Sequence, residues 1–192
     1  MVVVDSGFSH STVTPLINGF PVQPSIRRLD IGGKHLTNYL AELLAIHEIS
    51  LKEDPWIANE VKEECCFVSN DFKRDVERTW RGHQMDPSIV VDCQLPDYQH
   101  NSKVIVKPYE PRDQVFKNKS NITTVGNERF QVPEILFKPG DIGMREGGLS
   151  DVVIESIISL PISLQSVMFE NILVVGGNAK IPGFLQRLYV SF

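Results

Sequence analysis

Residues 2–7 read Val-Val-Val-Asp-Ser-Gly, and residues 172–178 read Ile-Leu-Val-Val-Gly-Gly-Asn. Each segment is an apolar run, typical of a buried strand, that stops at a turn of small residues. Small residues let backbone N–H groups approach an anion closely, as a phosphate-binding turn requires. A buried strand that ends in a glycine turn is more often only a strand and a turn. The two segments therefore suggest a single phosphate site built from distant parts of the chain. The sequence between them is needed to test this hypothesis.

The first part of the chain changes from a strand pattern to a helix pattern. The apolar residues predict strands over 2–4, 12–17, 20–22 and 25–31, with a hairpin turn at Asn18-Gly19. The spacing of an amphipathic helix follows at Leu36, Tyr39, Leu40, Leu43 and Leu44. A second helix is expected to begin after Pro55 and to extend toward Trp80.

The later part of the chain returns to alternating elements. Short strands and loops are expected over 87–125, and a short helix or turn over 132–137. Ser150-Asp151 is expected to cap a helix, and another short helix precedes the strand 172–175. Pro182 suits the first turn of a last helix, 183–190. This order predicts an α/β fold with a subdomain inserted between Gly32 and about Met144.

The composition is that of an ordinary globular chain. Of its 192 residues, 42% are apolar and 22% are charged, and the net charge of −5 argues against a nucleic-acid or membrane-surface binder. No apolar run reaches the roughly 20 residues that span a bilayer, and the start of the chain shows no signal peptide. Cys65, Cys66 and Cys93 lack metal-ligand spacing and are interpreted as reduced structural thiols.

Several strings occur in one fixed order along nearly the whole chain. They are Asp5-Ser6-Gly7, residues 28–34, Lys62-Glu63, residues 95–97, residues 126–130, Pro133-Glu134, Gly143-Met144, Gly176-Gly177 and Pro182-Gly183. The most specific is Gly-Asn-Glu-Arg-Phe at 126–130 followed by Pro-Glu. Together these strings resemble the actin family. Residues 68–75, residues 132–143 and the extra chain between 97 and 126 are most similar to a nuclear branch of that family.

The resemblance implies an actin-like, ribonuclease H-like ATPase fold in which this chain covers one lobe of a two-lobed clamshell. The base subdomain would be residues 1–31 with 145–192, incomplete toward its C-terminus. The outer subdomain would be residues 32–144, with a branch-specific insertion at about 98–125. The phosphate loop of the other lobe would precede Met1, so the chain is expected to be a fragment or a truncated gene model.

The resemblance also implies a nucleotide site that takes ATP or ADP with a divalent cation in the intact protein, whereas tight binding by this chain alone is not expected. Asp5, Ser6 and Gly7 would cradle the terminal phosphates, and Asp5 would orient water on the cation without binding the metal directly. The other expected contacts are Lys62 and Glu63 at the adenosine, Gly33 at the ribose, and Gly176, Gly177 and Asn178 beneath the nucleotide. The alternative is that these residues serve only the tight turns of the fold.

Hydrolysis is not expected, and no catalytic residue is assigned. Members of the family carry an acidic residue just after the Asp-Ser-Gly turn and a His further on that organises the attacking water. Those positions hold Phe8 and Thr12 here. A threonine takes up no proton at neutral pH, and His10, two places away, is a weak candidate for a general base.

Polymerisation is not expected either. Actin has an apolar loop that joins filament strands, and the corresponding residues, 138–142, read Lys-Pro-Gly-Asp-Ile. Asp141 would place a charge in a dry contact, which costs several kcal/mol unless it is paired.

The insertion at 98–125 has a composition of its own. It carries five basic and two acidic residues, a net charge of +3, together with apolar Ile105, Tyr109 and Phe116. A solvated loop and a docking surface for a partner subunit are both compatible with this stretch. We expect docking, because a long loop without structure of its own is usually functional or disordered.

The resemblance therefore implies a non-catalytic structural subunit of a nuclear chromatin-remodelling complex that deposits a histone variant. Its partners would be other subunits and, indirectly, histones. It would bind neither a membrane nor a specific nucleic-acid sequence directly, and it would form no filament of its own. The nucleus is the expected location, and the cytoplasm the second. The alternative is a cytoskeletal ATPase that hydrolyses ATP and polymerises. Phe8 and Thr12 argue against hydrolysis, and Asp141 argues against polymerisation.

Overall fold

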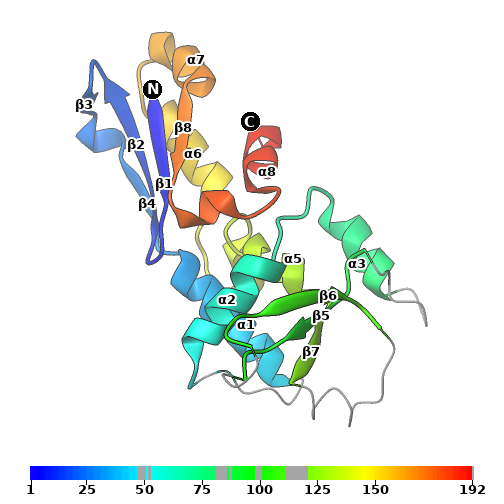
Figure 1. Cartoon of the computed structure of the whole chain (residues 1–192). Coiled ribbons are helices and arrows are strands. Elements are labelled where there is room, and N and C mark those ends of the chain that lie inside the picture. Colours follow the sequence, from blue (N-terminus) through cyan, green and yellow to red (C-terminus); the bar gives the residue numbers. More distant parts are fainter. Residues whose placement is uncertain are drawn as a thin grey trace. The chain divides into compact units, whose positions relative to one another are not determined.

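The protein, represented by a computed structural model, is described over residues 1–46, 51, 53–80, 86, 88–97, 101–110 and 121–191 (Figure 1). The chain divides into two compact units: the first unit comprises residues 1–35 and 134–192, and the second unit residues 36–133. The sequence places these boundaries at 31/32 and 144/145. Residues 134–144 belong to the first unit because Phe137 packs on Phe184 and Leu136 O accepts a hydrogen bond from Leu149 N.

The first unit is built on a sheet that joins the two apolar segments at 2–7 and 172–178. Its strands are β1 (Val2–Ser6), β2 (Ser11–Ile17), β3 (Phe20–Pro21), β4 (Arg27–Leu29) and β8 (Ile172–Val175). The strand order is β3-β2-β1-β8, with β4 paired to β2. β1 and β8 run parallel, from the pair Val2–Ile172 to the pair Asp5–Val175. The turns that follow these two strands therefore lie at the same end of the sheet.

Local turn chemistry explains the β2–β3 hairpin. Asn18 and Gly19 have φ angles of 51° and 83°, the left-handed values that a two-residue hairpin turn of this kind requires. The predicted turn is confirmed. The strand expected over 25–31 is shorter: Ser25 ends the 3₁₀ helix η1 (Gln23–Ser25), which has Pro24 in its first turn, and the strand β4 covers only Arg27–Leu29.

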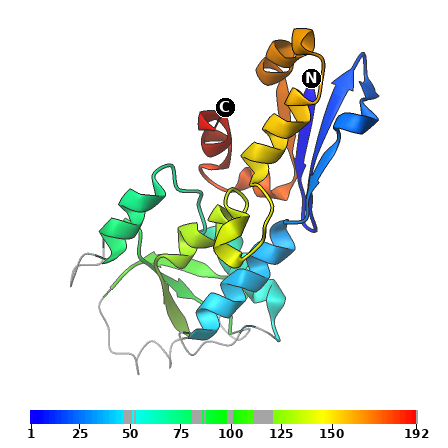
Figure 2. The same ribbon diagram turned by 180° about the vertical axis from the view of Figure 1, so that it is seen from behind.

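Three helices accompany this sheet: α6 (Leu149–Ile158), α7 (Ile162–Glu170) and α8 (Phe184–Val190). α6 packs on β2 and β4, as the view from behind shows (Figure 2). Two expected helix starts are wrong in detail. The N-cap of α6 is Gly148, whose N–H donates to Asp151 Oδ2 at 2.9 Å, so Asp151 acts from inside the first turn. The N-cap of α8 is Gly183, so Pro182 precedes the helix.

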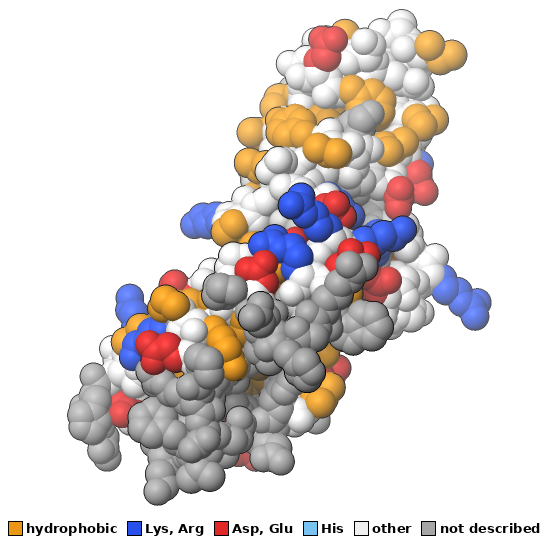
Figure 3. Space-filling model, turned by 90° about the vertical axis from the view of Figure 1, so that its right-hand side faces the viewer, with side chains coloured by type: hydrophobic (Ala, Val, Ile, Leu, Met, Phe, Trp, Pro, Cys, Tyr) orange, Lys and Arg blue, Asp and Glu red, His pale blue; other side chains and the backbone are white. Residues whose placement is uncertain are grey.

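β8 is an edge strand within the described part of this sheet. Its Leu173 and Val175 are 46% and 37% exposed. Leu185 and Tyr189 of α8 are exposed as well, and Figure 3 shows exposed apolar side chains of the first unit in orange.

In its described residues, the second unit combines helices with a small antiparallel sheet. The helices are α1 (Gly33–Ile46), α2 (Pro55–Cys65), α3 (Phe72–Trp80) and α5 (Glu128–Glu134). The strands are β5 (Val91–Gln94), β6 (Ile105–Pro108) and β7 (Ile122–Val125), in the order β6-β5-β7. Leu36, Leu40 and Leu44 of α1 are fully buried, which confirms the predicted apolar stripe. No described helix is both long and apolar enough to cross a membrane.

The single helix expected from Pro55 toward Trp80 is two helices. α2 ends at Cys65, and Cys66 has an extended backbone with ψ of 148°. The N–H of Phe67 donates to Arg129 O at 2.9 Å, so a residue far along the chain stabilises the break between α2 and α3. Asp71 Oδ1 then accepts from Arg74 N and starts α3.

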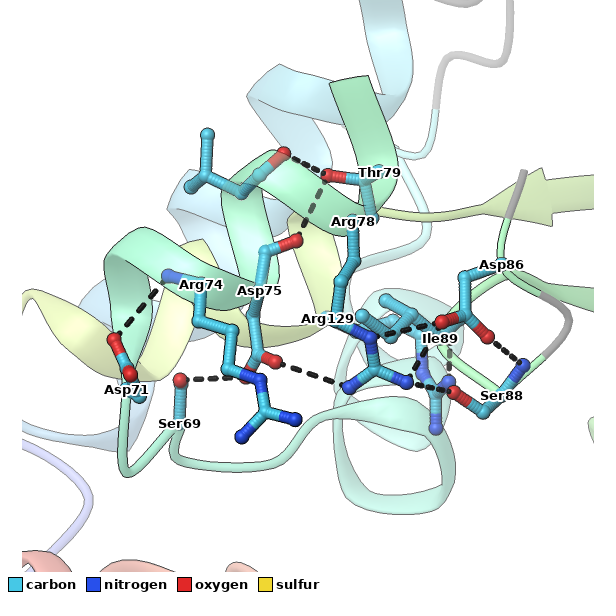
Figure 4. Close-up of polar contacts among 11 residues, drawn as sticks. Ser69, Asp71, Arg74, Asp75, Arg78, Thr79, Asp86, Ser88, Ile89 and Arg129 are labelled. Carbon is cyan, nitrogen blue, oxygen red and sulfur yellow. Dashed lines mark hydrogen bonds and ion pairs between the residues drawn. The ribbon is translucent and has the colours of Figure 1, made fainter. Parts of the chain in front are cut away.

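Arg78 anchors α3 to the segment before β5. Its guanidinium contacts Asp86 Oδ2 at 2.7 Å and donates to Ser88 Oγ at 2.8 Å (Figure 4). Hydrogen bonds from Ser88 and then from Arg78 lower the pKa of Asp86 to about 2. Arg129 of α5 donates to Ile89 O and to Cys65 O. These bonds tie α5 to the segment before β5 and to the end of α2.

Candidate functional site

The turn after β1 is locked to the start of α1 by backbone contacts. Gly33 N donates to Gly7 O at 3.0 Å, and Lys34 N donates to Phe8 O at 2.7 Å. A Cβ on Gly32 would lie 2.6 Å from both His10 N and Phe8 O, so only glycine fits there. The first donors of α1 are therefore used by the β1–β2 turn, and the N–H of Gly33 is engaged within the fold.

A chain of buried side-chain hydrogen bonds joins this turn to the turn after β8. Ser11 Oγ donates to Ile31 O at 3.0 Å and so accepts from Ser6 Oγ, which lies 3.0 Å away. Asn178 Nδ2 donates to Ser6 Oγ at 3.1 Å and to Gly7 O at 2.9 Å. Ser6 and Ser11 have no exposed surface, and Asn178 is 4% exposed. Of the predicted site residues, Ser6 and Asn178 thus use their side chains to join the two turns.

The two adjacent glycines after β8 have different surroundings. Gly176 has a φ of 98°, and a Cβ there would lie 2.2 Å from Ser6 O and 2.8 Å from Asp5 Oδ1. A Cβ on Gly177 would meet nothing within 4 Å. Gly176 therefore allows the close approach of the two turns, whereas Gly177 borders open space.

The joined turns still offer groups to a ligand. The backbone N–H groups of Phe8, Ser9 and Gly177 find no acceptor among the described residues. Asp5 is exposed at the end of β1 and makes no ion pair within the described part of the chain. Free N–H groups beside an exposed carboxylate can receive a phosphate together with a hydrated cation. No group of three or more His, Cys, Asp or Glu side chains that could hold a metal directly occurs among the described residues.

The residues that bear on hydrolysis lie on the same hairpin. Asp5 of β1 stands directly opposite Thr12 of β2 in the antiparallel register. His10 precedes β2, and its Nδ1 lies 2.9 Å from Ser9 Oγ. Phe8 is 63% exposed at the turn. The side chain next to the Asp5 carboxylate, which is predicted to orient water on the cation, is therefore the hydroxyl of Thr12, and the imidazole of His10 belongs to the turn.

Lys62 and Glu63 lie in the second unit, on α2. Lys62 is 5% exposed, and its Nζ donates to Asn59 Oδ1 at 2.8 Å and to Thr37 Oγ1 at 3.1 Å. Asn59 Nδ2 in turn donates to Glu63 Oε1 at 2.8 Å. Burial lowers the pKa of Lys62, while the charge of Glu63 opposes that shift. These residues form a local polar cluster, and their role toward adenosine stays a prediction.

The insertion is partly a strand. β6 pairs with β5, and within it Ile105 is 42% exposed and Val106 36% exposed. Tyr109 is half-buried, and Phe116 lies outside the described residues. The expectation of a stretch without structure of its own is therefore wrong for β6 and for β7 (Ile122–Val125), whereas the short strands expected over 87–125 are present. Asp141, from the loop expected to oppose polymerisation, is exposed in the 3₁₀ helix η2 (Pro139–Ile142).

Sequence reasoning missed a buried ion pair in the first unit. Glu134 is 1% exposed, and its Oε1 lies 3.0 Å from Arg187 Nη2 and 3.1 Å from Lys138 Nζ. The Arg187 guanidinium also lies over the Phe137 ring, 5.7 Å from its centroid. The Pro-Glu string marked this glutamate. Lys138 is four residues away, but the other cationic partner, Arg187, is distant in sequence. The contact fastens α8 to Glu134 within the first unit.

Comparison with known proteins extends over the whole chain. The family model described as Actin matches residues 1–55 and 51–191. "Actin-like protein arp6" of Emericella nidulans is 47% identical over 206 residues, which cover 98% of this chain and 43% of that protein. "Actin-related protein 6" of Neurospora crassa is 43% identical, over 98% of this chain and 45% of that protein. The protein of the same name in Drosophila melanogaster is 36% identical, over 97% of this chain and 46% of that protein.

These relatives agree with the branch that the sequence resembles most. The chain spans less than half the length of each of the three. None of their names refers to a conventional actin or to the cytoskeleton, so the cytoskeletal alternative is not favoured. Its α/β architecture and the match along its length show that the chain belongs to the actin family.

Proposed function

We propose that this chain is part of an actin-related structural subunit that holds ATP or ADP with a divalent cation as an element of its fold and does not turn it over. The observation that carries this proposal is the register of β1 and β2, in which Asp5 stands opposite Thr12. Side chains opposite each other in an antiparallel pair have Cβ atoms about 4.5–5.5 Å apart. Residue 12 is therefore the neighbour that could assist a water molecule near Asp5.

The chemistry of that neighbour favours binding over hydrolysis. A hydroxyl cannot serve as a general base at neutral pH, because it does not take up a proton there. Phe8 adds no charge beside the cation, and His10 is engaged with Ser9. Nucleotide would still find the N–H groups of the two turns and the carboxylate of Asp5. The site is thus suited to hold phosphate without activating water.

Single-turnover hydrolysis of ATP by the full-length protein tests this proposal. We expect bound ATP to persist, with conventional actin assayed in parallel as the positive control. Combining Phe8→Asp with Thr12→His is expected to raise the rate by roughly 100-fold, the scale of general base catalysis. Thr14→His is the matched control, because Thr14 faces Val3 and lies farther from the turn. A native rate equal to that of filament-forming actin would overturn the proposal.

We further propose that the subunit works in the nucleus, in a chromatin-remodelling complex that deposits a histone variant. The similarity to actin-related protein 6 supports this assignment, together with the departures from actin at Phe8, Thr12 and Asp141. Its partners would be other subunits and, indirectly, histones, without direct sequence-specific nucleic acid, membrane or self-filament contacts. Locating the tagged full-length protein and identifying the proteins that co-purify with it tests this role. A cytoplasmic protein without chromatin partners would contradict it.

Filament formation offers a separate test of the structural role. Asp141 is exposed on η2, where the corresponding loop of actin is apolar. We expect the full-length protein to stay in the supernatant under salt conditions that polymerise actin. Long two-stranded filaments in electron micrographs would contradict this expectation.

The edge strand β6 is proposed as the partner-docking element of the insertion. Ile105 and Val106 are exposed there beside Lys107, a mixture that suits a partner with apolar and acidic groups. We expect Ile105→Glu with Val106→Glu to weaken co-purification of the complex. Ile162→Glu is the control, because Ile162 is 86% exposed in α7 of the other unit. Equal recovery of the complex with both variants would show that β6 is not the docking element.

A further inference from the structure

Two of the three cysteine thiols are in contact in the core of the second unit. Cys65 is the last residue of α2, and Cys93 lies within β5. Their Sγ atoms are 2.8 Å apart, and the two side chains are 2% and 0% exposed. All three cysteines are free thiols, and no hydrogen bond of the Cys66 thiol is found among the described residues. Only Cys65 and Cys93 are thus placed as a pair.

The surroundings make the two thiols chemically unequal. The hydrogen bond between the two thiols is the main cause of the lowered pKa of Cys65, and the charge of Arg129 lowers it further. The same hydrogen bond raises the pKa of Cys93, and burial raises the pKa of Cys66. Arg129 is held in place because its Nε donates to Cys65 O at 2.8 Å. Cys65 is therefore the more acidic thiol of the pair, and Cys93 the less acidic one.

We propose that Cys65 and Cys93 form a redox-sensitive pair that a hydroperoxide converts into a disulfide joining α2 to β5. The Cys65 thiolate attacks one peroxide oxygen, the O–O bond breaks, and hydroxide leaves to give a sulfenic acid. The Cys93 sulfur then attacks the Cys65 sulfur, expels water and forms the S–S bond. In sum, two thiols and one hydrogen peroxide give one disulfide and two waters. Both thiols are oxidised, and the peroxide is reduced.

The position of the pair gives the cross-link a structural consequence. The disulfide would close residues 66–92, including α3, into a loop. In the sheet, Cys93 stands opposite Val106 of β6 on one side and Thr123 of β7 on the other. Oxidation would therefore pin the strand on which the exposed edge strand β6 is paired. This inference does not depend on the proposed nucleotide or chromatin role.

The experiment treats the purified, folded chain with hydrogen peroxide and then counts its thiols after denaturation. We expect the count to fall from three thiols to one, and to return to three with dithiothreitol. Tryptic digestion without reduction should join the peptide 63–73 to the peptide 82–103, which carries Cys93 as its only cysteine. Cys66→Ser is the matched control and should keep this cross-link, because Cys66 lies outside the pair. Cys65→Ser and Cys93→Ser should each lose it.

The mapping on the native sequence decides the question even if a variant fails to fold. Three intact thiols in the folded protein, under peroxide that oxidises the unfolded protein, would overturn the proposal. A cross-link through Cys66, or oxidation of Cys65 to a sulfinic acid without a cross-link, would overturn it as well.

Discussion

The joined turns of the first unit and the Lys62 cluster of the second unit were both predicted to contact nucleotide, yet they are built in opposite ways. The turns are joined by neutral groups, since Ser6, Ser11 and Asn178 satisfy one another without a charge. The Lys62 cluster buries an ammonium group against an amide oxygen and a hydroxyl. In the turns the buried side chains form the scaffold, which leaves recognition to the backbone N–H groups and to the exposed carboxylate of Asp5. In the Lys62 cluster the side chain itself carries the charge.

This difference matters when functional residues are carried over from a family. A residue that matches a binding motif can contribute by shaping the backbone or by contacting the ligand, and the two contributions respond differently to substitution. In the turns, most substitutions should reduce stability before they affect binding. In the Lys62 cluster, the pH dependence of stability should reveal the charge.

The largest effect is expected for Gly176→Ala. The new Cβ would lie 2.2 Å from Ser6 O, at a φ of 98° that disfavours any side chain. Strain and overpacking together should lower the free energy of unfolding by about 3–5 kcal/mol. Denaturant unfolding followed by circular dichroism measures this change. An unfolding midpoint equal to that of the native chain would show that the two turns can separate freely.

A smaller loss is expected for Asn178→Ala. The substitution removes the donor to the buried Ser6 Oγ and one of the two donors to the part-buried Gly7 O, which keeps its bond from Gly33 N. The free energy of unfolding should fall by about 1–3 kcal/mol. Asn171→Ala is a suitable comparison, because Nδ2 of Asn171 makes an exposed hydrogen bond to Val167 O. Equal losses of unfolding free energy in the two variants would show that the network between the turns contributes no more than an exposed hydrogen bond.

The Lys62 cluster should appear in the pH dependence of stability. The folded pKa of Lys62 lies below its ordinary value of 10.5 because burial disfavours the charged form. Between these two pKa values the unfolded chain binds more protons, so stability should rise as pH increases toward 10.5. Urea unfolding of the native chain and of Lys62→Met across this range isolates the contribution. The rise should be smaller in the variant, and identical slopes would contradict the buried charge.

The smallest effect on stability is expected for Gly177→Ala. Because the new methyl group meets nothing within 4 Å, the free energy of unfolding should change by no more than about 0.5 kcal/mol. Nucleotide affinity of the full-length protein should nevertheless fall, since the methyl group enters the open space beside the turns. Calorimetric titration with ATP measures it. Unchanged affinity would place the nucleotide elsewhere and leave Gly177 as an ordinary surface glycine.

Patterns local in sequence could be predicted, and contacts between distant segments could not. The apolar runs gave β1 and β8, and the spacing of Leu36, Leu40 and Leu44 gave α1, because both depend on neighbouring residues. The end of α2 depends on Arg129, whose carbonyl accepts from Phe67. Likewise, the motif marked Ser6 but not its burial, which depends on Asn178. The partners of Glu134 and Cys65 were hidden for the same reason.

The parallel pairing of β1 with β8 also sets an order for folding during synthesis. β1 is synthesised before the second unit, and β8 follows only after the whole second unit has been made. The pairs within the second unit's sheet join much closer residues, and such contacts form sooner. The second unit can therefore fold while β1 still exposes one unpaired edge. During that interval the unpaired edge of β1 is exposed to pairing with wrong strands. We therefore expect chaperones to bind the nascent chain.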